Sequence, residues 1–215
     1  MENRELGIRT TGDGSITFYS DQFDQHYHSI FGARTESERV FIELGYNYIL
    51  EHFNDPIQLL EVGFGTGLNA WLTGLAAEKS QRLTEYIGLE AYPIPKAHFD
   101  QFPTELQVYQ ELGWGEQHTI HPYYSVIKQN VNVQDFLSDR KFHLVYYDAF
   151  SPEAQPEMWS EELFQRIADM LEAGGVLSTY CSKGMVQRNL KAVGFEVEKH
   201  PGPPHKREVL RAIKK

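Results

Sequence analysis

The segment LLEVGFGTGLNA, residues 59–70, joins an apolar run to three closely spaced glycines and the beginning of a helical pattern. A continuous apolar run of this kind is typical of a strand buried on both faces of a parallel sheet. Gly63, Gly65 and Gly67 let the backbone approach a ligand closely because no Cβ intervenes. Free amides at the start of the next helix favour a polar or anionic group. The segment therefore predicts a ligand-binding turn, and a tight turn without a ligand is the alternative.

Strand and helix patterns alternate on both sides of this segment. The expected strands are residues 57–64, 83–91, 130–133, 142–150, 176–181, 195–200 and 207–213, and the expected helices are residues 37–53, 68–78, 93–112, 160–171 and 183–193. Such alternation predicts an α/β fold with parallel βαβ units. The last two strands are joined by a loop too short for a helical crossover, so they should be antiparallel. We expect a Rossmann-like, mostly parallel seven-stranded sheet with an antiparallel C-terminal strand.

The N-terminal part differs from this pattern because it is polar with scattered aromatic residues. The segment TTGDGSITFYS, residues 10–20, places the turn dipeptide Asp13-Gly14 before a β-prone run, which predicts a small hairpin or sheet edge. We expect residues 1–36 to form a small extension that packs on one Rossmann-like domain, residues 37–215.

Length and composition indicate a single globular domain. The chain has 215 residues, of which 41% are hydrophobic and 23% are charged, as in ordinary globular proteins. No apolar stretch is long enough to span a membrane, and the N-terminus lacks the apolar core of a signal peptide. The single cysteine, Cys181, excludes an intramolecular disulfide or a cysteine metal cluster, and the nine histidines are dispersed. We expect a cytoplasmic protein without a metal ion.

The formal net charge of −10 disfavours nucleic acid as a partner over most of the surface. The charge distribution is uneven, since residues 183–215 contain nine Lys or Arg and three Glu. Two interpretations of this basic segment remain open. It is either an ordinary solvated face or an edge that contacts phosphate groups on an otherwise acidic body.

Two acidic residues follow the next two expected strands. Glu90 ends the strand after the glycine turn, where a carboxylate can accept hydrogen bonds from both hydroxyls of a ribose. Asp135 follows the third strand and can bind an adenine amino group, with a helix N-cap as the alternative. Both side chains should lie near the glycine turn, because the carboxyl ends of parallel strands form the ligand-binding edge of such sheets. Together these features predict a nucleoside site.

The glycine turn and the two acids resemble the S-adenosyl-L-methionine site of class I methyltransferases. The short loop suits a ligand without a pyrophosphate, and Glu61 in the preceding strand would repel a pyrophosphate while attracting the cationic methionine part. The resemblance implies S-adenosyl-L-methionine as the cofactor. The residues expected to bind it are Glu61, Gly63, Gly65, Thr66, Gly67, Asn69, Glu90, Asp135 and Asp148.

The segment YYDAFSPEAQPEMWSEELF, residues 146–164, follows a further buried strand, at the place where a methyl acceptor would meet the cofactor. Asp148 ends that strand, which favours a functional role for its carboxyl group. Phe150, Met158 and Trp159 can exclude water from the site, and plain core packing is the alternative. The segment therefore predicts an acceptor site around Asp148.

Three segments resemble the methyltransferase domain of the MnmC family, namely DAFSPEAQPEMW at 148–159, LEVGFGTGLNA at 60–70 and KREVLRA at 206–212. The similarity extends from residue 10 to residue 212. It implies a class I methyltransferase fold and methyl transfer to the aminomethyl group of wobble 5-aminomethyl-(2-thio)uridine in tRNA. Two positions depart from the family pattern, since Ala149 stands where glycine is usual and His28 where phenylalanine is common.

The resemblance also implies roles for individual residues. Asp148 is the expected catalytic residue, which orients the amine and accepts or relays its proton. Bases of an anticodon loop stack on aromatic rings, and their phosphates require positive charge. The expected substrate-binding residues are Tyr27, His28, Phe150, Trp159, Lys206 and Arg207. Tyr27 and His28 are candidates to stack on the base, with packing over the sheet as the alternative, and Lys206 and Arg207 are candidates to contact phosphates.

The sequence contains no FAD-binding second half, so we expect a separate oxidoreductase to supply the aminomethyl intermediate. Two other functions remain open on sequence grounds. A small-molecule amine methyltransferase or an aminopropyltransferase would use a similar site, and the acidic surface suits a cationic polyamine. A non-catalytic module that has kept the fold is the other alternative, and binding of S-adenosyl-L-methionine would argue against it. The sequence does not predict the oligomeric state.

Overall fold

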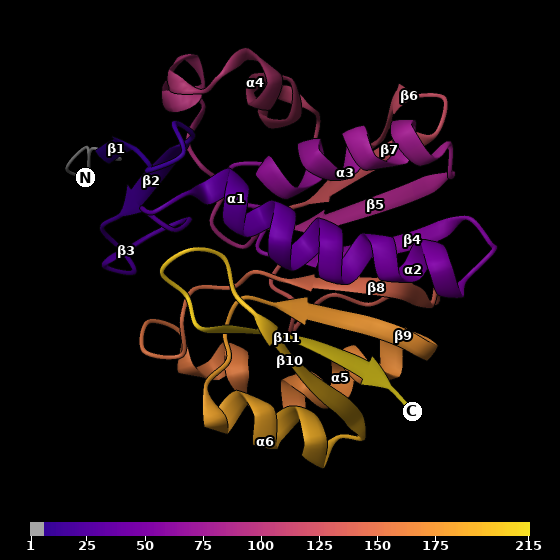
Figure 1. Ribbon diagram of the computed structural model, residues 1–215. Helices are drawn as coiled ribbons and strands as arrows, with labels where there is room; N and C mark the ends of the chain where they lie inside the picture. Colours follow the sequence, from indigo (N-terminus) through magenta and orange to yellow (C-terminus); the bar gives the residue numbers. More distant parts are fainter. Residues whose placement is uncertain (1–6) are drawn as a thin grey trace.

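A computed structural model describes residues 7–215 (Figure 1). Residues 1–6, where the expected N-terminal extension begins, lie outside the described residues. The main sheet has the strand order β10-β11-β9-β8-β4-β5-β7-β6, in which β9, β8, β4, β5 and β7 are parallel. Its strands are β4 (Ile57–Val62), β5 (Thr84–Leu89), β6 (Gln117–His121), β7 (Tyr124–Gln129), β8 (Phe142–Tyr147), β9 (Leu171–Thr179), β10 (Phe195–Pro201) and β11 (Glu208–Lys214).

Helices cover both faces of this sheet, which confirms the doubly wound α/β fold (Figure 1). One face carries a continuous helix, whose middle part is π-helical, together with α3, and the other carries α5 and α6. Phe41 and Ala70 belong to the apolar core on the first face, whereas Ile167 and Val186 belong to the core on the second. The helices are α1 (Ala33–Ser37), η1 (Glu38–Tyr46), α2 (Asn47–His52), α3 (Leu68–Ser80), η2 (Lys96–Gln101), α4 (Thr104–Glu111), η3 (Pro156–Trp159), α5 (Glu161–Met170) and α6 (Gly184–Ala192).

The N-terminal segment forms a separate antiparallel sheet of β1 (Gly7–Thr10), β2 (Ile16–Ser20) and β3 (Gln25–His26). The expected hairpin is confirmed, with Gly14 at φ 81° in the turn. Asp13 holds this turn against the first helix, because its Oδ2 atom accepts a hydrogen bond of 2.9 Å from the backbone amide of Thr35. The small sheet is therefore placed beside the carboxyl ends of the central strands.

The main sheet has eight strands rather than the expected seven, because β6 was not predicted. β6 is a partly exposed edge strand with the polar sequence QHTIH, so it lacks the apolar run that marks a buried strand. The strand expected at 130–133 was also wrong, since the strand beside β5 is β7 and ends at Gln129. Val131 and Val133 have high β propensity, but they lie in the turn that leaves the sheet.

Two further boundaries differ from the sequence predictions. The glycine pair 174–175 lies inside β9 instead of ending a helix, at a place where the register of β8 against β9 shifts between Phe142 and Leu144. The first long helix begins at Ala33, so it crosses the division expected after residue 36. The antiparallel pairing of the last two strands is confirmed. Within residues 7–215, no helix is both long and apolar enough to cross a lipid bilayer.

Candidate active site

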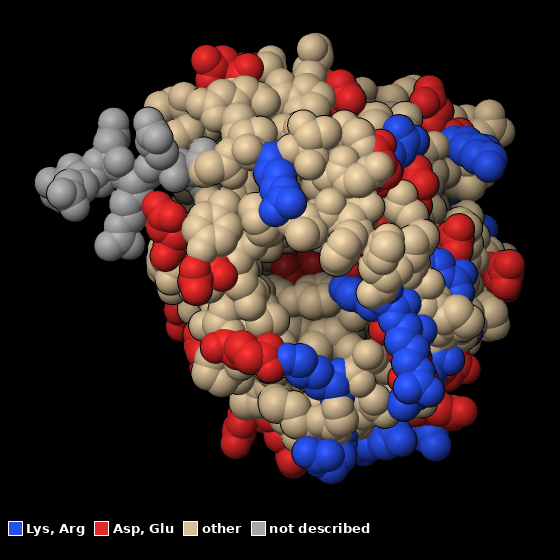
Figure 2. Space-filling model, turned by 60° about the vertical axis from the view of Figure 1, so that its left-hand side comes forward, with Lys and Arg blue, Asp and Glu red and all other residues tan. Residues whose placement is uncertain are grey.

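A cavity of about 320 Å³ opens at the carboxyl ends of β4, β5 and β8. Its walls also include the N-terminal segment around β3 and the loop between β10 and β11. Figure 2 shows the hollow from outside, with Lys and Arg side chains gathered along one side of its mouth. Both the position at this sheet edge and the volume are typical of small-molecule sites in open α/β proteins.

The glycine loop after β4 forms the floor of the cavity. Gly63, Gly65 and Gly67 all have positive φ angles, of 91°, 50° and 79°, which glycine adopts without the strain that a side chain would cause. A Cβ on Gly63 would lie 2.6 Å from the backbone oxygen of Asp148. The loop therefore depends on glycine both for its conformation and for its close contact with the end of β8.

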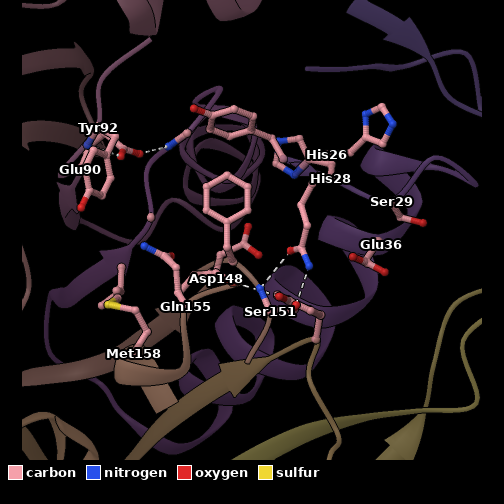
Figure 3. A pocket seen from close by; sticks show the side chains of 18 of the residues that line it. His26, His28, Ser29, Glu36, Glu90, Tyr92, Asp148, Ser151, Gln155 and Met158 are labelled. Atoms are coloured by element: carbon pink, nitrogen blue, oxygen red, sulfur yellow. Dashed lines mark hydrogen bonds between the residues drawn. The ribbon is translucent and has the colours of Figure 1, made fainter. Parts of the chain in front are cut away.

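Glu90 lies beside this loop, as the sequence predicted (Figure 3). Its two carboxylate oxygens accept hydrogen bonds of 2.8 Å from the backbone amides of Gly65 and Tyr92. Burial raises the pKa of Glu90, while these backbone donors act in the opposite direction. The carboxylate is thus fixed at the cavity wall, where the hydroxyl groups of a ribose can reach it.

Asp148 reaches the cavity from the end of β8 (Figure 3). Its Oδ2 atom accepts a hydrogen bond of 2.9 Å from Nδ2 of Asn69. Burial, followed by the negative charge of Glu36, raises the pKa of Asp148 to about 7, while Asn69 and Lys206 act to lower it. This carboxyl group therefore exchanges a proton near neutral pH.

Glu61 does not line the cavity, which corrects the expectation that its carboxylate faces the bound cofactor. Its side chain is fully buried beneath the glycine loop, where it accepts hydrogen bonds from Tyr86 and from Asn69. Burial raises the pKa of Glu61 well above its usual value. The same Nδ2 atom of Asn69 contacts both Glu61 and Asp148, so Glu61 helps to hold Asn69 against Asp148.

Aromatic residues of the N-terminal segment cover part of the cavity. The Tyr27 and Phe150 rings meet edge to face at 5.1 Å, and Phe23 stacks on Phe150 at 4.5 Å. Gln25 fixes this cover to the loop after β8 through two hydrogen bonds with Ser151. The cover therefore connects residues more than a hundred positions apart in the chain.

His28 also lines the cavity, where its Nε2 atom is 2.7 Å from Oγ1 of Thr66. Burial lowers the pKa of His28 to about 4, so the ring is neutral near pH 7. Thr66 itself is buried behind this contact and is not part of the wall. The hydroxyl group of Thr66, an expected cofactor contact, therefore holds the His28 ring at the wall.

The predicted cofactor-binding residues Gly67 and Asn69 are buried and, like Glu61 and Thr66, do not line the cavity. Three further sequence-predicted residues also lie away from it. Asp135 is exposed, because the chain turns after β7 and only the preceding residues of this turn reach the wall. Trp159 is fully buried in the core, and its Nε1 atom donates a hydrogen bond of 2.8 Å to the backbone oxygen of Phe150. Arg207 is exposed and does not line the cavity, whereas its neighbour Lys206 does.

Two other wall residues, Glu36 and Tyr180, were not predicted from the sequence. Glu36 lies in the first turn of the long helix and Tyr180 follows the end of β9. Neither belongs to a recognisable motif, and only the folded chain brings them together. Among residues 7–215, no group of three or more His, Cys, Asp or Glu side chains could hold a metal ion.

Residues 90–215 match the model of a protein family described as S-adenosyl-L-methionine-dependent methyltransferase. The chain belongs to this family. Two relatives of the methyltransferase are named tRNA 5-methylaminomethyl-2-thiouridine biosynthesis bifunctional protein MnmC. The protein from Leptospira borgpetersenii is 29% identical over 91% of this chain and 33% of its own length. The protein from Pseudoalteromonas atlantica is 30% identical over 99% of this chain and 34% of its own length.

The resemblance to the methyltransferase domain of MnmC is thereby confirmed, although the chain spans only about a third of the length of these relatives. Two solved structures show the same fold. MnmC2 from Aquifex aeolicus has a TM-score of 0.83 and 23% identity, over 98% of this chain and 71% of its own. Spermidine synthase from Thermotoga maritima has a TM-score of 0.62 and 16% identity, over 98% of this chain and 69% of its own.

The cavity of the methyltransferase has groups that fit S-adenosyl-L-methionine. A Cβ on Gly65 would lie 3.1 Å from the ring of Tyr27, so glycine keeps the floor clear. Glu90 presents a carboxylate to the wall, which suits ribose hydroxyls. The buried Oδ1 atom of Asn69 has no hydrogen-bond partner among residues 7–215, but Asn69 does not line the cavity. The residues present are therefore compatible with this cofactor.

Proposed function

We propose that this methyltransferase methylates the aminomethyl nitrogen of wobble 5-aminomethyl-(2-thio)uridine in tRNA, which gives 5-methylaminomethyl-(2-thio)uridine. The names of the two MnmC relatives refer to biosynthesis of 5-methylaminomethyl-2-thiouridine in tRNA. The resemblance of the DAFSPEAQPEMW segment to the same family supports this choice of substrate over other amines.

The observation that carries the proposal is the carboxyl group of Asp148, which faces the cavity and has a pKa raised to about 7. An alkyl amine is largely protonated in water, and only its neutral form has a lone pair for attack. A proton acceptor is most effective when its pKa is close to the working pH. The Asp148 carboxylate is therefore suited to orient an amine and to take its proton.

Other wall residues have complementary roles in this proposal. S-adenosyl-L-methionine supplies an activated methyl group when it is bound. The glycine loop and Glu90 would hold it at the ends of β4 and β5, beside Asp148. Phe150 and Met158 line the cavity and limit the access of water to the amine.

The tRNA would approach the mouth of the cavity with the wobble base turned inward. Tyr27 and Phe150 offer aromatic surface for the uracil ring, and the exposed Arg207, which follows Lys206 of the cavity wall, is available to a phosphate. Trp159 supports the site from the core through its contact with Phe150 rather than by stacking on the base. A separate oxidoreductase that supplies the aminomethyl intermediate, and a cytoplasmic location, remain predictions.

Purified protein, S-adenosyl-L-methionine and tRNA from cells that lack this protein provide the test. Mass spectrometry of the digested tRNA should show the aminomethyl nucleoside converted to its methylaminomethyl form. Asp148→Asn should lower the transfer rate by a factor on the order of 10² to 10⁴ while calorimetry shows that the cofactor still binds. Asp139→Asn removes an exposed carboxylate away from the cavity and should leave transfer unchanged.

Two results would contradict the proposal. Cells that lack the protein should accumulate the unmethylated aminomethyl nucleoside, so an unchanged set of wobble nucleosides would refute it. Methyl or aminopropyl transfer to free polyamines, with no transfer to tRNA, would instead favour a small-molecule amine transferase.

A further inference from the structure

The amino group of Lys206 is enclosed by a carboxylate and an aromatic face inside the cavity. Its Nζ atom is 2.7 Å from Oε2 of Glu36 and lies 4.4 Å from the centroid of the Tyr180 ring. All three residues line the same cavity as Asp148. A carboxylate combined with the face of an aromatic ring is a common way for a protein to bind an alkyl ammonium ion.

The Tyr180 ring and the backbone that carries Glu36 are held by contacts that do not involve Lys206. Glu36 lies in the first turn of the long helix, where its backbone amide donates to the oxygen of Gly32, and its side chain is only 13% exposed. The Tyr180 hydroxyl donates a hydrogen bond of 2.9 Å to the backbone oxygen of Ala149. The ring is therefore fixed independently of any bound cation, and so is the helical turn that carries Glu36.

The enclosed amine is close to the group that the proposed reaction uses. The charges of Glu36 and Lys206 both act on Asp148, in opposite directions. Asp148 and Glu36 thus present two carboxyl groups to one region of the cavity (Figure 3). A cation bound by Glu36 therefore lies in the same cavity as Asp148 and within range of its charge.

The end of a lysine side chain and the aminomethyl group of the expected substrate have the same chemistry. Each is a primary ammonium on a methylene carbon, so a site that fits one also fits the other. Lys206 comes from the loop between β10 and β11, and its side chain is 31% exposed. Its flexible stem can leave the cavity without a change in the core.

We propose that Glu36 and the face of Tyr180 form an ammonium subsite for the methyl-acceptor amine, which Lys206 occupies until a substrate amine replaces it. This inference rests on the proposed function, because it places the aminomethyl group beside Asp148. It gives Glu36 a role in recognising the charged amine before the proton is removed. It also assigns Lys206 to the cavity instead of to a phosphate of the tRNA.

Calorimetry with two nucleosides tests the subsite in the presence of S-adenosylhomocysteine. The probes are 5-aminomethyluridine, which is cationic, and 5-hydroxymethyluridine, which is neutral and similar in size. Glu36→Gln should weaken binding of the amine about tenfold, and Lys206→Met should tighten it because the competing ammonium is gone. Neither variant should change binding of the hydroxymethyl nucleoside.

Two variants serve as matched controls. Glu38→Gln changes the neighbouring exposed carboxylate of the same helix, which pairs with Arg34. Lys199→Met removes an exposed ammonium of β10, which pairs with Glu208. Both should bind the two nucleosides as the unaltered protein does, because neither side chain lines the cavity.

Three results would overturn the subsite. The first is that the unaltered protein binds 5-aminomethyluridine no more tightly than 5-hydroxymethyluridine. The second is that Glu36→Gln weakens binding of both nucleosides equally, and the third is that Lys206→Met weakens binding of the amine. These results are independent of methyl transfer to tRNA. If one of these results is found while methyl transfer to tRNA is intact, the subsite is refuted and the proposed function still holds. If the protein prefers the amine but does not methylate tRNA, the subsite holds and the proposed function is refuted.

Discussion

The carboxyl group of Asp148 lies between Asn69, which donates to its Oδ2 atom, and the opposite charges of Glu36 and Lys206. Burial and Glu36 raise its pKa to about 7. We predict that Glu36→Gln lowers the pKa of Asp148, because the like charge is removed and Lys206 loses its partner. The titration of the Asp148 carboxyl carbon in ¹³C-labelled protein, assigned by its absence from Asp148→Asn, measures this shift. Glu38→Gln should leave the pKa of Asp148 unchanged. An unshifted titration curve in Glu36→Gln would show that the carboxyl groups of Glu36 and Asp148 do not interact.

The raised pKa of Asp148 also has a consequence for stability. Its native pKa of about 7 exceeds the unfolded value of 3.8, so the native state binds more protons between these two pH values. The contribution of Asp148 to the free energy of unfolding is fully present below the unfolded pKa. It is lost as the pH rises through the native pKa. The asparagine of Asp148→Asn cannot ionise, so the variant does not lose this contribution as the pH rises. We therefore predict that the free energy of unfolding of the variant minus that of the unaltered protein, measured in urea, is higher at pH 8 than at pH 4. An equal difference at the two pH values would contradict the raised pKa.

The sequence could predict some cavity residues because strand ends of a parallel sheet meet at one edge. Glu90 and Asp148 each directly follow a strand, so their positions along the chain were enough to place them near the glycine loop. Asp135 was misplaced because its expected strand lies in a turn. Glu36 and Tyr180 are more than a hundred positions apart, and their meeting depends on the packing of the long helix against the sheet.

At the scale of elements, the turn between β4 and α3 depends on Gly63. We predict that Gly63→Ala destabilises the protein by about 2–4 kcal/mol, through backbone strain and a clash with the end of β8. It should also abolish detectable cofactor binding, because the loop has to move. Gly194→Ala is the matched control, since Gly194 has the same φ of 91° as Gly63 but open space around its Cβ position. It should cost about 1 kcal/mol and leave cofactor binding intact.

Urea unfolding and calorimetry with S-adenosyl-L-methionine measure both effects. Equal losses of stability in the two variants would show that the contact with Asp148 is unimportant. Retained cofactor binding in Gly63→Ala would show that the glycine loop is not part of the cofactor site.

The alternation of helices and strands was predictable because most central strands are buried on both faces and form short apolar runs. The exceptions were elements without such a run. β6 is polar because it is an edge strand, and the glycines of β9 interrupt its pattern where the register shifts. The contact between the N-terminal sheet and the loop after β8 was unpredictable, since Gln25 and Ser151 meet only in the folded chain.

At the scale of the molecule, ion pairs neutralise much of the basic C-terminal segment. Lys199, Arg211 and Lys215 pair with Glu208, Glu198 and Glu196. Lys183 pairs with Glu153 and Lys206 with Glu36. The remaining positive charge is therefore much smaller than the count of Lys and Arg suggests, on a chain whose net charge is −10.

Within residues 7–215, the exposed Arg188 and Arg207 are in no ion pair. The Arg188 side chain reaches back to Gly184 at the start of α6, and Arg207 follows Lys206 of the cavity wall. We predict that Arg188→Ala and Arg207→Ala each weaken tRNA binding and reduce the steepness of its dependence on salt by about one unit of log–log slope. Lys191→Ala removes the same charge at the far end of α6, so it controls for the change in net charge. Filter binding at several salt concentrations measures the slopes. If all three variants change the slope equally, tRNA binding depends on net charge alone. If none of them changes the slope, Arg188 and Arg207 do not contact phosphate groups.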